Sequence, residues 1–431
     1  MSHQSRSRAA GARTLLRGVP APAAALVAAL VAGLTACGGP SGDPLASRPY
    51  DAAHQLTVGT AGRAAGRPAD PDQPLVVTAR DGGRITDVTA SDEAGRHLRG
   101  ELTADGRRWH STTPLTADTH YTLRVSTENG RGAPGRHTLG VDTAEAGDRR
   151  LRVALGPGSG TYGVGQPLTA RLSDPVADPA ERALVERSLK VTSRPAVTGS
   201  WTWVDDRTLH YRPRGYWPAH ATVSVRSTLR GARVRPGLFG GATPPMTLRT
   251  GDRVEAVTDA AAHRMTVLRD GRVVRVLPVT TGKSGYETRN GVKVILSREE
   301  TVRMRGTTIG ISESSDDSYD LLVHWAARLT WSGEYVHAAP WSVDSQGYEN
   351  VSHGCTGMST EDAHWFFETT RVGDIVRTVN SGGATMTPFD NGFGDWNVPW
   401  RLWRANSALT PHRAAPDAAD GTRSARLRPG T

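Results

Sequence analysis

The sequence contains very little cysteine: two in 431 residues, Cys37 and Cys355. Cys37 falls at the end of an N-terminal leader, so we expect Cys355 to be the one thiol of an exported chain. A single thiol excludes an internal disulfide. Because a lone exported thiol is a liability, its reactivity is expected to be used, although an inert buried cysteine is the plain alternative.

Long apolar runs are also lacking, apart from one in the leader. The run AAALVAALVAGL follows a basic stretch without acidic residues, and small residues follow the run. The basic residues are Arg6, Arg8, Arg13 and Arg17. This order is typical of a secretory signal, and the run is too short and too alanine-rich to span a bilayer comfortably. We therefore expect a signal peptide over residues 1–36.

The end of the leader, LTAC at residues 34–37, resembles the lipobox of bacterial lipoproteins. That resemblance implies cleavage before Cys37 and a lipid on its sulfur. The lipid would hold the chain on the outer face of the cell membrane, from which it reaches into the cell wall. An ordinary signal peptide with a chance cysteine is the alternative.

Positive charge predominates only modestly. The formal net charge is +9, and removal of the leader arginines would leave about +5. Such a balance suits an anionic wall and membrane face. Basic stretches interleaved with aromatic residues are lacking, which argues against a nucleic-acid partner.

Turn-rich, alternating sequence follows the leader. Residues 37–72 are rich in Gly, Pro, Ala and Asp and predict a flexible tether. Residues 73–148 and 149–250 each consist of short alternating runs split by turn signals, which is typical of immunoglobulin-like β-sandwiches. In the second module, ADPAERALVERSLK predicts a short helix, and a hairpin is expected to turn at Asp205-Asp206.

A denser unit at residues 251–380 is predicted to be β-rich, with a hairpin at Asp270-Gly271 and with GVKVILSREE as one further strand. STEDAHWFFETTRVGD predicts a helix capped by Ser359. A Trp-rich segment at 381–406 is expected to pack back on this unit, and residues 407–431 to be disordered. The predicted fold class is therefore mainly β: two sandwiches, then a β-rich domain with a short helix after its cysteine.

The stretch VHAAPWSVDSQGYENVSHGCTGM at residues 336–358 surrounds Cys355. Cys355 lies four residues before Ser359, so the N-terminus of the predicted helix is expected to stabilise a thiolate and lower its pKa. Gly354 permits a tight turn whose N–H groups could receive an oxyanion. His337 and His353 are both candidates for the base, and spacing alone does not choose between them.

A metal site is the rival hypothesis for this stretch. The side chains that could bind zinc are those of His337, His353, Cys355 and His364. However, the sequence has no CxxC or HExxH spacing. We therefore expect no metal and no cofactor.

His337 followed by Ser352-His353-Gly354-Cys355 resembles the signature of L,D-transpeptidases with a YkuD-type catalytic domain. The order of the modules is also similar to that of the two-module L,D-transpeptidases of actinobacteria: lipobox, tether, two immunoglobulin-like modules, catalytic domain and the end GDWNVPWRLWRA. The resemblance covers residues 37–406.

The resemblance implies peptidoglycan chemistry. Such enzymes attack the carbonyl of the third residue (meso-diaminopimelate) of a tetrapeptide stem and release D-Ala. They pass the thioester to a diaminopimelate side-chain amine on a neighbouring stem, which gives a 3→3 cross-link. By position, Cys355 is the implied nucleophile and His337 the general base and acid. Amides around His353, Gly354 and Cys355 are the implied oxyanion hole, with Ser352 in support, and carbapenems inhibit this family by acylating the same thiol.

Further residues are assigned by the same resemblance. Tyr319 matches a lid tyrosine, and Ser332 and Gly333 match a substrate-contacting pair. For each, a plain loop residue is the alternative. The glycine-containing, Ser/Asp-rich segment 303–325 is a candidate lid over the substrate, with a tolerated surface insertion as its alternative.

The chain departs from the family at two positions. Ala338 follows the implied base where close relatives have Ser, so a main-chain carbonyl is expected to orient the His337 ring. Gly357 occupies a position often filled by Asn, and this difference bears on donor preference.

Two other functions are left open by the sequence. The same thioester could pass to water, to a free D-amino acid or to a protein amine, which would make the enzyme an L,D-carboxypeptidase or a protein-to-wall attachment enzyme. A non-catalytic wall-binding lipoprotein is the alternative from another class. The oligomeric state is likewise left open.

Overall fold

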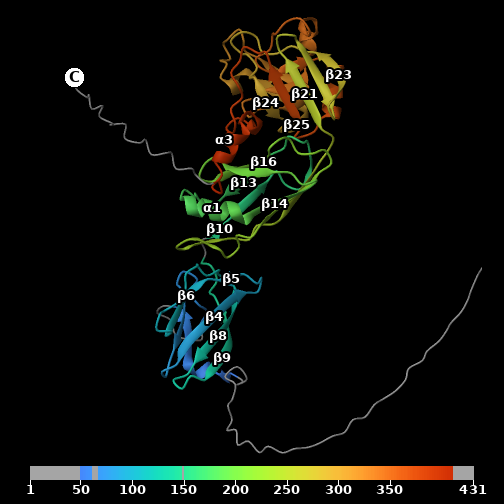
Figure 1. Cartoon of the computed structure of the whole chain (residues 1–431). Coiled ribbons are helices and arrows are strands. Elements are labelled where there is room, and N and C mark those ends of the chain that lie inside the picture. The colour runs from blue at the N-terminus through green and yellow to red at the C-terminus, as the bar shows by residue number, and fades with distance from the viewer. Residues whose placement is uncertain (1–48, 61–66, 148–149, 411–431) are drawn as a thin grey trace, which may run out of the picture. The chain divides into compact units, whose positions relative to one another are not determined.

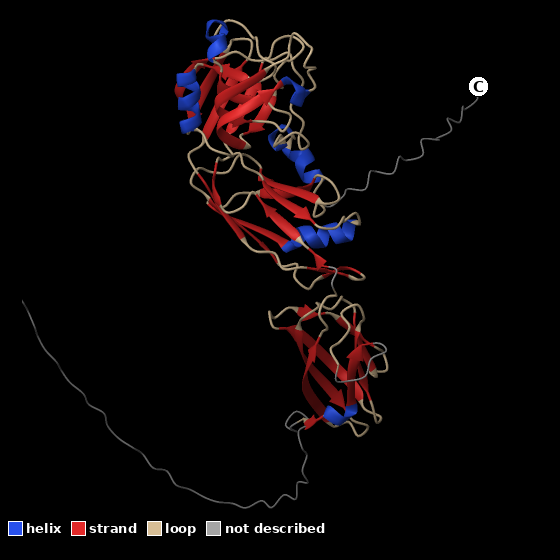
Figure 2. Ribbon diagram, turned by 180° about the vertical axis from the view of Figure 1, so that it is seen from behind, coloured by secondary structure: helices blue, strands red, loops and turns tan. Residues whose placement is uncertain are grey.

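The computed structural model describes residues 49–60, 67–147 and 150–410. Strands far outweigh helices in these ranges (Figures 1 and 2), so the predicted mainly β fold class is confirmed. None of the helices in these ranges is long and apolar enough to cross a membrane. The predicted signal peptide, Cys37 and residues 411–431 of the predicted tail lie outside the described residues.

The first module is a sandwich of a five-stranded sheet, ordered β1-β9-β8-β4-β5, and a four-stranded sheet, ordered β2-β3-β7-β6. Alternation along each strand places one face in the core, as with Tyr121, Leu123 and Val125 on β8. The elements are β1 (Tyr50–Asp51), η1 (Ala53–Gln55), β2 (Leu56–Thr60), β3 (Leu75–Ala79), β4 (Arg84–Asp92), β5 (His97–Leu98), β6 (Gly100–Leu102), β7 (Arg108–Ser111), β8 (His120–Glu128) and β9 (Pro134–Asp142).

The predicted tether, residues 37–72, extends too far. Strand β2 pairs with β3 along its whole length, from Leu56 opposite Ala79 to Thr60 opposite Leu75, and β1 pairs with β9. The sandwich therefore begins near residue 50. The Gly- and Ala-rich composition around these short strands did not indicate them. Pairing with a partner strand holds them in place, and local sequence preference does not reveal such pairing.

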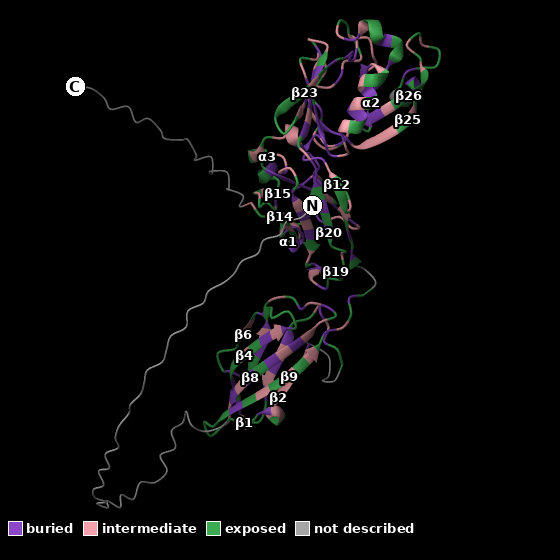
Figure 3. Ribbon diagram, turned by 90° about the vertical axis from the view of Figure 1, so that its right-hand side faces the viewer, coloured by how far each residue is buried: buried purple, intermediate pink, exposed green. Residues whose placement is uncertain are grey.

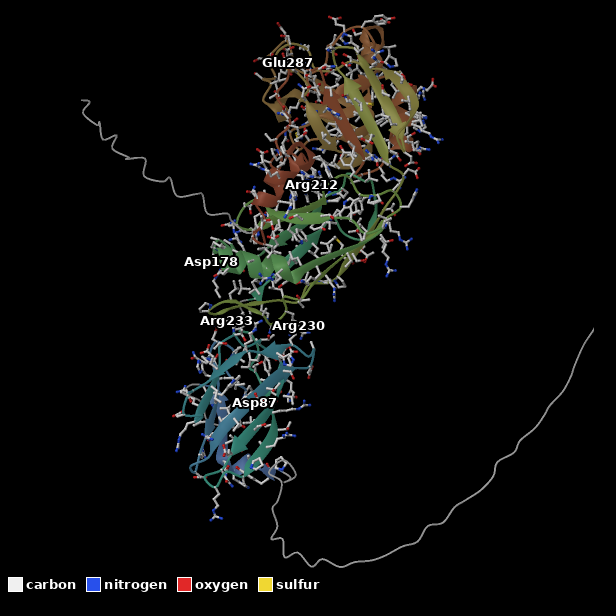
Figure 4. All side chains as sticks on the ribbon, in the orientation of Figure 1. Asp87, Asp178, Arg212, Arg230, Arg233 and Glu287 are labelled. Carbon is white, nitrogen blue, oxygen red and sulfur yellow. The ribbon has the colours of Figure 1, made fainter. Side chains whose placement is uncertain are left out.

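The second module holds three small sheets, ordered β11-β13-β16-β15, β12-β20-β17-β14 and β10-β19-β18. The predicted hairpin is confirmed, because β15 and β16 pair on either side of Asp205-Asp206. The predicted helix is α1 (Pro179–Ser188), capped by the Asp178 carboxylate (labelled in Figure 4), which accepts from the amides of Ala180 and Glu181. The strands are β10 (Arg150–Leu151), β11 (Val153–Gly156), β12 (Gly160–Tyr162), β13 (Leu168–Leu172), β14 (Leu189–Arg194), β15 (Gly199–Trp203), β16 (Thr208–Pro213), β17 (Thr222–Ser227), β18 (Arg233–Arg235), β19 (Leu238–Gly240) and β20 (Met246–Thr250).

The third module packs two sheets, ordered β23-β22-β21-β29-β24 and β25-β26-β27-β28. Helix α2 (Thr360–Thr369) lies beside β26 (Figure 3) and buries Ala363, Phe366 and Phe367. The predicted hairpin at Asp270-Gly271 is confirmed by the pairing of β22 with β23. The strands are β21 (Val254–Asp259), β22 (Arg264–Arg269), β23 (Arg272–Pro278), β24 (Gly291–Val294), β25 (Ser297–Arg305), β26 (Asp320–Arg328), β27 (Tyr335–Ala338), β28 (Thr356–Met358) and β29 (Ile375–Val379).

Two predictions for this module need correction. GVKVILSREE is not one strand: β24 pairs with β29 in one sheet and β25 with β26 in the other, and the chain crosses between the sheets at Ile295 and Leu296. A continuous apolar run cannot reveal such a crossing. The candidate lid is also shorter than 303–325, because its ends are strands paired up to Arg305 opposite Asp320, which leaves a loop at 306–319 that includes η2 (Gly306–Ile309).

The Trp-rich segment contacts two modules. On the second module, Trp396 Nε1 donates to Gly165 O (2.8 Å) and Trp403 Nε1 to Ser200 O (2.9 Å). On the third, Asn397 Oδ1 accepts from the Val292 amide at 2.8 Å. The helical turns are η4 (Asp395–Asn397) and α3 (Trp400–Ala405). The predicted disordered tail begins too early, because Ser407 is buried and donates to Glu186 Oε1 at 2.5 Å.

Candidate active site

A short parallel strand pair brings the two ends of the cysteine stretch together. Strand β27 pairs with β28, with His337 opposite Gly357. Cys355 directly precedes β28, and η3 (Pro340–Ser345) and a loop make the crossover between the strands. His337 and Cys355 consequently line one cavity although seventeen residues separate them in the sequence.

The His337 ring is held in one tautomer. Its Nδ1 lies 2.7 Å from Ala338 O, and because a carbonyl only accepts, Nδ1 carries the proton and Nε2 is free to accept one. The ring is 6% exposed, and burial lowers the pKa of His337. The imidazole is therefore neutral at pH 7, as a general base requires. The main-chain carbonyl expected to orient it is the one observed.

The environment of Cys355 differs from the prediction. Strand β28 separates it from the helix, whose first turn is capped by Ser359 Oγ, the acceptor for the Asp362 amide at 3.1 Å. The expected lowering of the thiol pKa by the helix N-terminus is wrong. Burial raises the pKa of Cys355 to about 12, aided by the charge of Glu334 and opposed by the Tyr335 amide and Lys293. The resting nucleophile is a neutral thiol.

The thiol of Cys355 donates to Gly333 O at 3.5 Å. Among the described residues, no hydrogen bond joins its sulfur to the His337 ring. The side chain is partly exposed because it lines the cavity. The thiol must therefore leave Gly333 O and turn to His337 before the imidazole takes its proton.

The turn before Cys355 is built around Ser352 and Gly354. Gly354 has φ of +117°, a conformation that side chains rarely adopt. Its amide donates to Ser352 Oγ at 3.1 Å, and Ser352 Oγ donates to Cys355 O at 2.7 Å. Ser352 thus shapes the loop as a support residue. Of the three amides predicted to bind an oxyanion, that of Gly354 is already engaged here.

His353 is packed by aromatic rings. Tyr319 stacks on it with centroids 5.1 Å apart, and Tyr286 meets it edge-on at 4.7 Å. Its Nε2 lies 3.4 Å from Asp317 Oδ1, and Asp317 also forms an ion pair with Lys283. These contacts favour a positioning role for His353 and leave His337 as the base. They also join the loop at 306–319, which contains Asp317 and Tyr319, to the cysteine loop.

Two cavities adjoin the cysteine loop, and His353 lines both. The first, of about 360 Å³, is lined by Cys355, His337, Tyr319, Gly357 and the apolar side chains of Met304, Val323 and Trp341. The second, of about 580 Å³, is polar and is lined by Ser332, Gly333, Gly354, Arg289, Glu334 and Glu287, the last labelled in Figure 4. The predicted substrate-contacting residues are thus divided between two spaces, and Ala338 is buried.

Comparisons with known proteins agree with this geometry. Residues 253–378 match the L,D-transpeptidase catalytic domain (YkuD), and residues 67–233 match a bacterial Ig domain. The chain is 36% identical over 338 residues to L,D-transpeptidase 2 of Mycobacterium tuberculosis. The aligned region covers 78% of this chain and 81% of that protein. This chain belongs to the L,D-transpeptidase family. It is therefore a cysteine-dependent acyltransferase.

Two further relatives are similar to the enzyme. L,D-transpeptidase 5 of Mycobacterium tuberculosis is 32% identical over 371 residues, 82% of this chain and 78% of that protein. The structure of LD transpeptidase LdtMt1 in complex with imipenem has 38% identity, covers 54% of this chain and 99% of that chain, and gives a TM-score of 0.46.

Gly357 has a packing reason to lack a side chain. A Cβ at this position would lie 2.9 Å from Ala339 Cβ and 3.1 Å from Thr280 Cγ2. Thr280 forms a bridge to Gly357 on one side while β27 pairs on the other. A side chain here would require Ala339 or Thr280 to shift, which accounts for a glycine at this position.

Of the four residues of the rival metal hypothesis, His337, His353 and Cys355 line one cavity, but His364 does not. His364 lies on α2 with its ring 4.3 Å from that of Trp325. In the described ranges, no group of three or more His, Cys, Asp or Glu side chains could hold a metal ion.

Several polar residues near the site were missed by sequence reasoning. They are Lys283, Tyr286, Arg289, Lys293, Asp317 and Glu334. They come from loops and strands far apart in the chain. One signal was present for Lys293, a charged residue inside the apolar run VKVIL.

Proposed function

We propose that the enzyme forms 3→3 cross-links in peptidoglycan, with a tetrapeptide stem as acyl donor and the side-chain amine of diaminopimelate on a neighbouring stem as acceptor. One observation carries the proposal: a buried, neutral His337, with Nδ1 fixed on Ala338 O and Nε2 free, shares a cavity with the thiol of Cys355. Family membership supplies the reaction class.

In the acylation step, the thiol proton passes to His337 Nε2 as the sulfur attacks the carbonyl of the third stem residue. Because the pKa of the thiol is raised and that of the imidazole is lowered, an ion pair does not form in advance, so proton transfer accompanies the attack. The developing oxyanion is assigned to the amides of His353 and Cys355, because that of Gly354 is engaged with Ser352 Oγ. His337 then returns the proton to the leaving D-Ala amine, and a thioester remains on Cys355.

In the second step, the acceptor amine attacks the thioester carbonyl and gives a proton to His337, which protonates the departing thiolate. An amine must compete with water for this thioester, so water must be partly excluded. The apolar lining of the first cavity and the loop at 306–319, tied down through Asp317, supply such cover. The second cavity gives the other substrate a separate approach to the cysteine loop.

The proposal extends to location and inhibition. A lipid on Cys37 would hold the enzyme at the outer face of the cell membrane, and the two sandwich modules would extend its reach to the wall. Carbapenems are proposed to acylate Cys355, since they are acylating agents and a similar transpeptidase is known in complex with imipenem.

Intact-mass spectrometry of the chain from about residue 50, incubated with a disaccharide-tetrapeptide, tests the proposal; Cys355→Ala is the matched control. A 3→3 dimer with loss of D-Ala, absent from the variant and insensitive to a chelator, is the expected result. An adduct that only hydrolyses would assign an L,D-carboxypeptidase. No adduct with either the tetrapeptide or a carbapenem would leave a wall-binding lipoprotein.

A further inference from the structure

Lys293 is a buried charge in the middle of the third module. It lies on β24, is 0% exposed, and its Nζ is 2.6 Å from Glu334 Oε2 and 3.4 Å from Thr378 Oγ1. Burial lowers the pKa of Lys293 and the carboxylate of Glu334 opposes that change, so Glu334 is required for Lys293 to stay charged. An apolar side chain could fill this position at a lower cost in free energy. Packing alone therefore does not account for the charge.

Glu334 binds a second cation. Its Oε1 accepts from Arg289 Nη1 at 2.8 Å and from the Arg289 amide at 3.1 Å. Arg289 lines the polar cavity and its side chain is 39% exposed, whereas Lys293 is wholly enclosed. The three side chains form a cluster of two positive charges and one negative charge, named here the Lys293–Glu334–Arg289 cluster. Its net charge is positive.

The cluster lies against the nucleophile through the backbone. Glu334 directly follows Gly333, whose carbonyl accepts from Cys355 Sγ at 3.5 Å. Glu334 Cγ also lies beside the residue that precedes the nucleophile, 3.9 Å from where a Cβ on Gly354 would be. A change in the Glu334 side chain is therefore expected to affect both the Gly333 carbonyl, which accepts the hydrogen bond from the thiol, and the turn at Gly354 that carries Cys355.

We propose that Glu334 and Lys293 are positioning residues for Cys355: Glu334 holds the Gly333 carbonyl against the thiol, and Lys293 supplies a buried positive charge that offsets Glu334 and favours ionisation of the thiol. Lys293 is wholly enclosed and does not touch the substrate, whereas Glu334 lines the second cavity and is 5% exposed. Because Lys293 is enclosed, water screens its charge less than that of Arg289. The proposal rests on Cys355 acting as the nucleophile.

Other ionisable groups face Cys355 from several elements. They are Tyr319, Tyr335, His337 and His353, with Asp317 and Lys283 beyond His353. Burial raises the pKa of both tyrosines and lowers that of His337, so these three are neutral at pH 7. Asp317 and Lys283 compensate one another. The cluster variants leave all of these groups in place, so a displacement between their curves reports on the cluster.

The test is the rate of Cys355 alkylation by iodoacetamide across pH 6 to 10 on the full chain, measured by mass spectrometry of the peptide that contains Cys355, because Cys37 is a second thiol in the sequence. The variants are Lys293→Met, the double variant Lys293→Met/Glu334→Gln, and Arg289→Gln as a control that removes an equal but more exposed charge. Lys293→Met is expected to displace the pH–rate curve toward higher pH by about one unit. Alkylation at pH 7 would then be about tenfold slower. The double variant, which also removes the opposing charge, should recover most of that loss, and Arg289→Gln should displace the curve less.

Lys293→Arg keeps the charge and covers the case in which Lys293→Met fails to fold. The pH–rate curve of Lys293→Arg should lie near that of the parent. The curve of the double variant gives the effect of removing both charges of the pair. A Lys293→Met curve that coincides with the parent, or a double variant as slow as the single one, would overturn the proposal. Alkylation needs no stem peptide, so failure of cross-linking with these displacements intact would remove only the proposed function.

Discussion

Two groups of buried charges in this molecule invite comparison: the Lys293–Glu334–Arg289 cluster beside Cys355, and the group where the second module meets the Trp-rich segment. In the latter, Asp395 is 0% exposed and lies 2.8 Å from His210 Nδ1. Arg212, labelled in Figure 4, lies over the rings of Trp396, Trp400 and Trp403 at 4.5 to 5.5 Å. Burial lowers the pKa of Arg212 to about 10, so it stays charged at pH 7.

The difference lies in what the charges face. At the junction, Arg212 and Asp395 face aromatic rings, a histidine and backbone carbonyls, none of which changes protonation in a reaction. Their geometry fixes where the Trp-rich segment docks. Beside Cys355, the charges face a thiol that must lose and regain a proton in each turnover. Buried charges thus serve assembly in one region and reactivity in the other. Substitutions at the active site should therefore lower activity and spare stability, and substitutions at the junction should do the reverse.

Damage at the active site should remove activity and spare the fold. His337→Gln keeps the size of the side chain but removes the base, so we expect acylation by tetrapeptide to fall about 10²- to 10⁴-fold. The measurement is the rate of adduct formation by intact mass, with thermal unfolding as the control. A variant that acylates normally would show that another group, with His353 as the first candidate, takes the proton.

Damage at the junction should do the reverse. Trp403 is 0% exposed and donates to Ser200 O, so Trp403→Ala leaves a cavity and an unpaired carbonyl and should lower the free energy of unfolding by about 3–5 kcal/mol. Denaturant unfolding measures the loss, and Cys355 alkylation below the transition serves as the comparison. An equal loss of thiol reactivity would mean that the two regions are coupled.

Local signals allowed much of the fold to be predicted. The hairpins at Asp205-Asp206 and Asp270-Gly271 were found because turn chemistry acts within a few residues. The pairing of β27 with β28 was not, because it is parallel and joins strands across a long crossover. The crossing at Ile295 was also missed, because the residues on both sides of it form one continuous apolar run in the sequence.

The site divides in the same way. The family resemblance predicted Cys355 and His337 as a pair and a main-chain carbonyl as the orienting group; the structure identifies that carbonyl as Ala338 O. The charge state of the thiol was predicted wrongly because three residues that read as the entry to a helix form strand β28. The proximity of Lys293 and Glu334 depends on tertiary packing, which neither local pattern nor spacing encodes.

Asp374 is a third buried charge, at the contact between β29 and the second module, where Gly163 approaches too closely to admit a Cβ. Burial raises its pKa to about 7 from the usual 3.8. The folded state therefore binds the extra proton between about pH 4 and pH 7, and stability should fall as pH rises through that range and then level off. Asp374→Asn should be more stable than the parent at pH 8 by roughly 1–2 kcal/mol and nearly equal at pH 4, as measured by denaturant unfolding. A gain that is the same at both pH values would contradict this origin.

The smallest expected effect separates helix capping from thiol activation. Ser359 Oγ accepts from the Asp362 amide, so Ser359→Ala should lower the free energy of unfolding by about 1 kcal/mol through loss of the cap. Strand β28 stands between this helix and Cys355, so the pH–rate curve for alkylation should not move, in contrast to the displacement expected from Lys293→Met. Thr360→Ala, one position into the helix, is the matched control because its hydroxyl is not the cap. If Ser359→Ala shifted the thiol curve, the helix N-terminus would act on the nucleophile after all, and the buried cluster would no longer be the main source of its charge environment.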